Sequence, residues 1–207
     1  RDSGKSWSGN LIGDHTRHGE ILGVALRPGE PDTVLAAGAE AGMFRSTDGG
    51  ETWEPANSGL GTRLLHQVTF ANSNSDVAYV ATHEGIYRSN DAGMSWMERN
   101  NGLQYRFTTP IAVDPRDEDV VFAGSASEVY TTHPNHFNPG LHEGEGLYKS
   151  VDGGKNWFRS DEGVDEAKLV QMATHPLFPF NLWADGESGR GAFFTPDAGQ
   201  NWLFSPN

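Results

Sequence analysis

The sequence contains no cysteine, and this absence excludes a disulfide framework and thiol chemistry. Basic residues are also few, because 15 lysines and arginines stand against 28 aspartates and glutamates, giving a formal net charge of −13. An acidic surface repels nucleic acid and anionic membranes, so we expect neither as a partner. No apolar run approaches the roughly 18 residues of a membrane span, and no segment keeps a helical period. We therefore expect an all-β protein without membrane insertion.

One short phrase recurs along the chain with the pattern Ser/Thr-x-Asp-x-Gly-x-x-Trp. Four full copies occupy residues 46–53, 89–96, 150–157 and 195–202, and a shorter copy occupies residues 2–7. Successive aspartates of the phrase are 46, 43, 61 and 45 residues apart, and about 45 residues is the length of one four-stranded propeller blade. The phrase residues to which we assign a structural role are Asp2, Asp48, Trp53, Asp91, Trp96, Asp152, Trp157, Asp197 and Trp202.

Each unit repeats outside the phrase as well. Two short apolar runs separated by a polar turn are followed by a Gly-aromatic-basic segment that leads into the phrase, and such runs are typical of strands. The sequence predicts a single β-propeller domain over residues 1–207, with four whole four-stranded antiparallel blades and a partial one. We divide it into a partial blade at 1–12 and whole blades at 13–58, 59–102, 103–162 and 163–207.

The phrase has the composition of a hairpin between the third and fourth strands of a blade. Its glycine permits the positive φ that a tight turn needs, and its aspartate and hydroxyl group can accept hydrogen bonds from turn amides. Its tryptophan can return into the space between neighbouring blades. A catalytic or calcium-binding role for the aspartate is the alternative, but a catalytic residue needs to occur only once.

At this spacing the phrase resembles the Asp-box, or bacterial neuraminidase repeat, of a β-propeller family. Thr52 and Ser95 keep the hydroxyl group before tryptophan, whereas Asn156 and Asn201 depart from it. The family includes sialidases, xyloglucan-cleaving glycosidases, sortilin-type receptor domains and photosystem assembly propellers, so the resemblance implies a fold but no single chemistry. It also implies a secreted, periplasmic or otherwise extracytoplasmic location. Because the chain begins inside a repeat, we expect a larger propeller, completed by further blades of a parent chain or by an oligomer partner.

The predicted strand order separates the loops into two faces. The repeated phrases lie on one face, and the resemblance places the active site of related glycosidases on the opposite one. Loops on a rigid scaffold often bind ligands, although these loops can equally be a solvated surface. The ligand-binding candidates on that opposite face are His15, His18, Arg63, His66, His83, Arg106 and Arg190.

The long third step contains about 16 additional residues, which fall between residues 125 and 145. Imidazole and carboxylate groups in this insertion could bind zinc, with His133, His136 and His142 as the candidates. Their spacing matches no closed zinc site, so we expect neither a metal nor another cofactor. The insertion can instead be a lid beside the central channel or a simple surface loop.

Two classes of function remain, and we favour the first. In the first, the chain is a non-catalytic binding or scaffold domain for a glycan or protein partner. In the second it is a glycoside hydrolase, sialidase-like or xyloglucanase-like. Most glycoside hydrolases use two carboxyl groups roughly 5–9.5 Å apart, whereas the resemblance implies for a sialidase a tyrosine nucleophile assisted by a glutamate. The catalytic candidates are Glu84, Glu187 and Tyr105. A sialidase would also need an arginine triad, for which Arg63, Arg106 and Arg190 are the candidates, but the Arg-Ile-Pro phrase of that family is absent.

Overall fold

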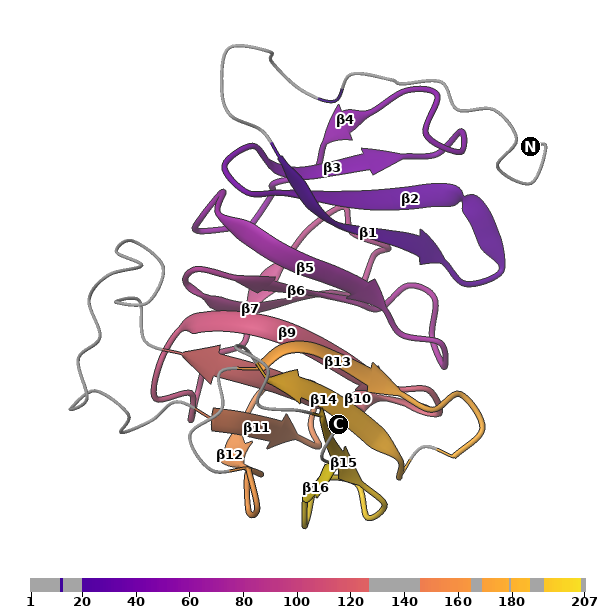
Figure 1. The fold of residues 1–207 in the computed structure, drawn as a ribbon. Helices are drawn as coiled ribbons and strands as arrows, with labels where there is room; N and C mark the ends of the chain where they lie inside the picture. The colour runs from indigo at the N-terminus through magenta and orange to yellow at the C-terminus, as the bar shows by residue number, and fades with distance from the viewer. Residues whose placement is uncertain are drawn as a thin grey trace.

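The computed structural model describes residues 12, 20–126, 146–164, 169–178, 180–186 and 192–205, which fold into four antiparallel sheets of four strands each (Figure 1). The first sheet contains β1 (Ile21–Arg27), β2 (Glu30–Gly38), β3 (Gly42–Ser46) and β4 (Glu54–Pro55). The second contains β5 (Leu65–Phe70), β6 (Ala78–Thr82), β7 (Gly85–Ser89) and β8 (Met97–Glu98). The third contains β9 (Phe107–Asp114), β10 (Asp117–Ala126), β11 (Gly146–Ser150) and β12 (Phe158–Arg159). The fourth contains β13 (Leu169–Thr174), β14 (Leu182–Gly186), β15 (Ala192–Thr195) and β16 (Leu203–Ser205).

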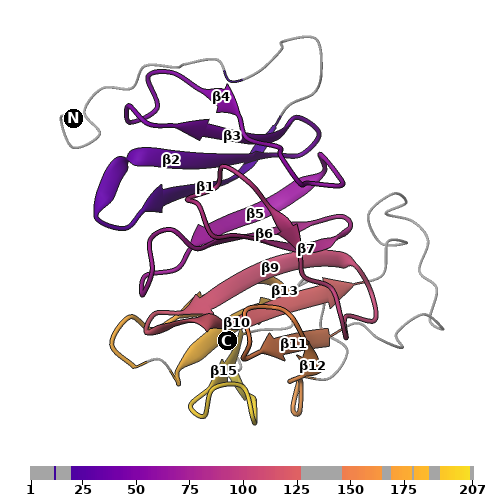
Figure 2. The ribbon, with the colours of Figure 1, turned by 180° about the vertical axis from the view of Figure 1, so that it is seen from behind.

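The sheets are successive blades of a β-propeller fold, which confirms the predicted fold class. Each is a simple meander in which consecutive strands pair. The first strands of the four sheets, β1, β5, β9 and β13, pack against one another in chain order, and this order is visible from both sides (Figures 1 and 2). The described residues include no helix that could span a membrane. The partial blade expected at residues 1–12, apart from Ile12, and most of the insertion lie outside the described residues.

The hydrophobic core lies between the sheets, in three clusters that each join one sheet to the next. The second strand of each of the first three sheets contributes a large side chain to these clusters. Leu35, Tyr79 and Phe122 are all 0% exposed. Burying the face of one blade against the next therefore supplies most of the apolar contact, as expected for an architecture built from repeats.

The repeated phrases form hairpins between the third and fourth strands, in which hydroxyl and aspartate side chains accept hydrogen bonds from backbone amides. In the first copy the amide of Gly50 donates to Ser46 Oγ at 2.9 Å, and the amide of Thr52 donates to Asp48 Oδ1 at 2.9 Å. Corresponding bonds occur in the other three full copies. The glycine of the first copy has a φ of +91°, the left-handed region that favours glycine. A structural role of the aspartate thus accounts for its recurrence.

The tryptophans join neighbouring blades by a hydrogen bond as well as by burial. Trp96, Trp157 and Trp202 are 3–4% exposed. Their indole N–H groups donate across the interface to the carbonyl oxygens of Ala56, Arg99 and Ser160 in the preceding sheet, at 3.0, 2.8 and 2.7 Å. Trp53 differs, because it is half-buried and donates to Gly50 within its own turn.

A second repeated contact sits beside each of these tryptophans. The backbone amide of Trp157 donates at 2.9 Å to the carbonyl oxygen of Asn101. The next residue, Gly102, has a φ of +94°, and a Cβ there would lie 2.2 Å from the carbonyl oxygen of Trp157. In the same way, the backbone amides of Trp96 and Trp202 donate hydrogen bonds to the carbonyl oxygens of Ser58 and Glu162. Sequence inspection overlooked this Asn/Asp-x-Gly turn, although it recurs at residues 57–59, 100–102 and 161–163.

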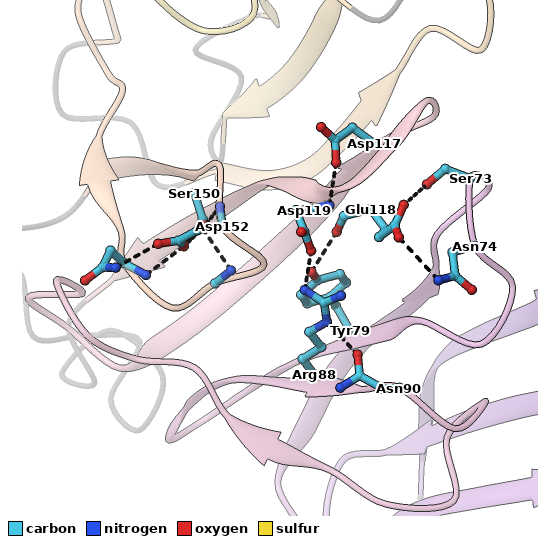
Figure 3. Close-up of polar contacts among 12 residues, drawn as sticks. Ser73, Asn74, Tyr79, Arg88, Asn90, Asp117, Glu118, Asp119, Ser150 and Asp152 are labelled. Atoms are coloured by element: carbon cyan, nitrogen blue, oxygen red, sulfur yellow. Dashed lines mark hydrogen bonds and ion pairs between the residues drawn. The ribbon is translucent and has the colours of Figure 1, made fainter.

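Polar side chains also connect the second and third sheets on the face that carries the phrases (Figure 3). Arg88 on β7 forms an ion pair with Asp119, and the hydroxyl group of Tyr79 on β6 donates to the carbonyl oxygen of Glu118 at 2.7 Å. The Glu118 carboxylate accepts from Ser73 and Asn74 in the β5–β6 turn. This network links the two blades on the face that carries the phrases.

Candidate functional site

Each of the four innermost strands carries an irregularity of pairing close to its start. The extra residue is Leu22 in β1, His66 in β5 and Val170 in β13, and the irregularity in β9 falls at Thr109 and Pro110. A β-bulge re-aims side chains and is common beside functional sites. His66 is the one ionisable residue among these bulge positions, so one blade departs here from the apolar or hydroxyl pattern of the others.

The bulges lie along a groove of about 440 Å³ on the innermost strands. Its polar lining consists of His66, Gln67, Thr109 and Gln171, which come from three different sheets. Within the described residues the lining includes no aspartate, glutamate, lysine or arginine. The apolar part of the lining consists of Leu22, Val24, Val68 and Met172, with Gly23 between the first two.

His66 is held by a hydrogen bond and by two rings. Its Nδ1 lies 2.8 Å from the carbonyl oxygen of Thr108. Its ring centroid lies 4.6 Å from that of Phe107 and 6.1 Å from that of His83. Burial lowers the pKa of His66 from its ordinary value, and the nearby His83 adds to this effect, while the bond to Thr108 opposes it. The imidazole is therefore favoured in its neutral form.

A buried hydroxyl group fixes the segments that carry these rings. Thr108 is 0% exposed. Its Oγ1 accepts a hydrogen bond from the Thr82 amide and lies 3.1 and 3.0 Å from the carbonyl oxygens of Thr82 and Gly85, to which it can donate. This side chain thus ties the start of β9 to the β6–β7 turn, which contains His83. The arrangement of His66, His83 and Phe107 is consequently pre-organised by the backbone.

The other described candidates do not converge on the groove. Arg106 is exposed and its Nη1 lies 3.1 Å from Glu98 Oε1. Arg63 is exposed beside the β2–β3 turn, where its carbonyl oxygen accepts from the Gly42 amide. Glu84 is exposed next to His83 in the β6–β7 turn, and Tyr105 is half-buried before β9. The structure therefore brings the rings of His66 and His83 together, while Arg106 pairs with Glu98 and neither arginine lines the groove.

Several predicted site residues lie outside the described residues. No described group of three or more His, Cys, Asp or Glu side chains is arranged to hold a metal ion. The predicted residues outside the described part of the chain are Asp2, His15, His18, His133, His136, His142, Glu187 and Arg190.

Sequence reasoning overlooked three polar residues of the groove, Gln67, Thr109 and Gln171. One signal was available for Gln67. In a regular strand adjacent side chains point to opposite faces, so the consecutive polar pair His66-Gln67 at the start of an apolar strand is unusual. The bulge resolves it, because it brings both side chains to the same groove.

The chain was compared with protein-family models and with curated proteins, and only the first comparison gave a match. A family model described as the BNR/Asp-box repeat matches residues 44–55. No curated protein matches the chain.

Solved structures match over most of the chain. An ancestral GH74 enzyme has a TM-score of 0.69 and 20% identity over 91% of this chain and 24% of its own length. The GH74 xyloglucanase from Xanthomonas campestris has a TM-score of 0.63 and 19% identity, with coverage of 87% and 29%. YCF48 bound to D1 peptide has a TM-score of 0.60 and 22% identity, with coverage of 98% and 59%. This chain thus spans about a quarter of the GH74 enzymes and just under three fifths of YCF48.

Proposed function

This chain is an Asp-box repeat β-propeller, and we propose that it is a non-catalytic domain that binds a glycan or a protein partner in the groove on its innermost strands. Similar folds occur in GH74 enzymes and in YCF48 bound to D1 peptide, so the fold itself is compatible with carbohydrate and with peptide. We also propose an extracytoplasmic location, as the family resemblance implies.

The observation that carries the proposal is the chemistry of the groove lining. Most glycoside hydrolases use a pair of carboxyl groups beside the scissile bond. The described lining instead offers an imidazole, two amides and a hydroxyl group, with apolar side chains beside them. A concave surface with a few fixed polar groups among apolar ones is suited to binding.

A glycoside hydrolase remains the second candidate, because two specific observations favour it. The GH74 enzymes, one a xyloglucanase, are among the structures with the highest similarity. Glu84, next to His83 in the β6–β7 turn, supplies one exposed carboxyl group, which lies outside the groove lining. The second carboxyl group of a catalytic pair would have to come from residues beyond those described, of which Glu187 is the sequence candidate.

Binding and turnover can be measured on the same preparation. We expect saturable binding of an oligosaccharide or a displayed peptide by calorimetry, with no release of reducing ends from xyloglucan or other β-glucans. Release of reducing ends that Glu84→Gln abolishes would overturn the proposal in favour of a hydrolase. Failure to bind any member of a glycan panel and of a displayed peptide library would also refute it. Glu98→Gln is the matched control, because Glu98 is also exposed but pairs with Arg106 outside the groove.

A further inference from the structure

Two adjacent side chains in the groove have complementary hydrogen-bonding capacity. His66 and Gln67 both line it because of the bulge in β5. We propose that they form an acceptor and donor pair that binds two neighbouring hydroxyl groups of an uncharged sugar. This inference rests on the proposed binding function and specifies its ligand class.

The acceptor is Nε2 of His66. The carbonyl oxygen of Thr108 can only accept a hydrogen bond, so Nδ1, 2.8 Å away, carries the proton. A neutral imidazole has one N–H group, and Nε2 is therefore left as a lone-pair acceptor. Burial, which disfavours the imidazolium form, maintains this state.

The donor is the side-chain NH₂ group of Gln67. Its Oε1 accepts the backbone amide of Ile111 at 2.9 Å, which fixes the orientation of the amide, because an NH₂ group cannot accept that bond. The same bond connects β5 to β9 and holds the side chain in place. The NH₂ group of Gln67 makes no hydrogen bond to a described residue, so it is available to a ligand in the groove.

The rest of the lining favours a sugar over a peptide terminus or an acidic glycan. A sugar hydroxyl group both donates and accepts, so a neighbouring pair can satisfy His66 and Gln67 together. The described lining has no basic residue to bind a carboxylate and no acidic residue to bind an ammonium group. Leu22, Val24 and Met172 offer apolar surface to the C–H groups of a sugar ring, while Thr109 and Gln171 offer further polar contacts. The groove volume of about 440 Å³ lies within the range of small-molecule sites.

The decisive variant is Gln67→Glu, measured at pH 8, well above the lowered pKa of His66. A carboxylate keeps the acceptor for the Ile111 amide but replaces the NH₂ donor by a second acceptor. We expect the Tm to change little and the affinity for the probes cellotetraose and xylotetraose to fall about 10- to 100-fold, as for loss of a buried hydrogen bond. Gln104→Glu, an exposed position outside the groove lining, is the matched control and should bind as wild type.

A second variant, His66→Phe, keeps a ring beside Phe107 but removes the acceptor, and should weaken binding at least tenfold. Neutral oligosaccharide binding that neither Gln67→Glu nor His66→Phe weakens would overturn this inference and leave the binding function standing. Binding of an uncharged peptide, but of no sugar, would overturn the sugar assignment alone. Glu84-dependent turnover would instead remove the proposed function itself.

Discussion

Replacing Trp157 by alanine should strongly destabilise the fold. Trp157 is 4% exposed between the second and third sheets, and a buried aromatic side chain covers about 150–250 Å², worth roughly 4–6 kcal/mol at 25 cal/mol per Å². The variant also leaves the carbonyl oxygen of Arg99 without its indole partner. Because part of this area is already buried in the unfolded chain, we expect the free energy of unfolding to fall by about 3–5 kcal/mol.

Trp53→Ala is the matched comparison, because the residue occupies the same position of the same phrase. Trp53 is half-buried and donates only to Gly50 in its own turn, so we expect a loss of about 1–2 kcal/mol. Urea unfolding should be followed by far-ultraviolet circular dichroism, since both variants change the tryptophan fluorescence. Equal losses in the two variants, or a loss below about 1 kcal/mol for Trp157→Ala, would refute the view that tryptophan stabilises the fold by burial between blades.

Three further changes test other parts of the structure. A hydrogen bond from the Asn201 side chain is the main cause that lowers the pKa of Asp197 to about 2. The ionised Asp197 therefore stabilises the fold fully above its unfolded pKa near 3.8, and this stabilisation is lost as the pH falls toward 2. Between pH 5 and pH 2 the Tm should fall less in Asp197→Asn than in the wild type. Ala198 has a φ of +58°, a conformation that is sterically costly for alanine but not for glycine. Ala198→Gly should therefore increase the free energy of unfolding by about 0.5–1 kcal/mol, which urea unfolding would show as a higher midpoint concentration. Trp183 is 40% exposed on the last sheet and is expected to promote association. Trp183→Thr should therefore lower the apparent mass in sedimentation velocity at high concentration.

Much of the fold could be predicted from the sequence because the conserved spacing within each repeated phrase determines the shape of a turn. The hydroxyl group, aspartate and glycine of each phrase contact one another within a few residues, so their spacing determines the turn. The role of tryptophan between blades was also predictable, since a large apolar side chain recurring once per unit must be buried by the neighbouring unit. The difference at Trp53 could not be predicted, because its environment depends on what lies before the first described sheet rather than on its own phrase.

The groove was less predictable than the turns, for a physical reason. A bulge is a property of the pairing between two strands, here β5 with β6, and the sequence of β5 alone does not show where the extra residue falls. His66 and His83 were identified as binding candidates by residue type, and the structure brings their rings to 6.1 Å. Arg106 was selected by the same reasoning, but the structure pairs it with Glu98 at the end of β8. The sequence pattern locates this two-residue strand only approximately, so the pairing could not be predicted.

The repeat also indicates where this chain departs from a uniform propeller. Arg45 and Lys149 occupy the same position on the third strand of their sheets and donate to the carbonyl oxygens of Ala92 and Ala198 in the next blade. The fourth sheet has Phe194 at this position, with its ring 5.1 Å from that of Trp183. A phenylalanine cannot donate to a carbonyl oxygen, so the fourth sheet does not repeat this contact. The second sheet has Arg88 at this position, where it pairs with Asp119. His66 is the corresponding departure among the bulges. Positions that agree across the repeats are explained by packing between blades, and departures such as Phe194 and His66 are places where contacts beyond that packing are expected.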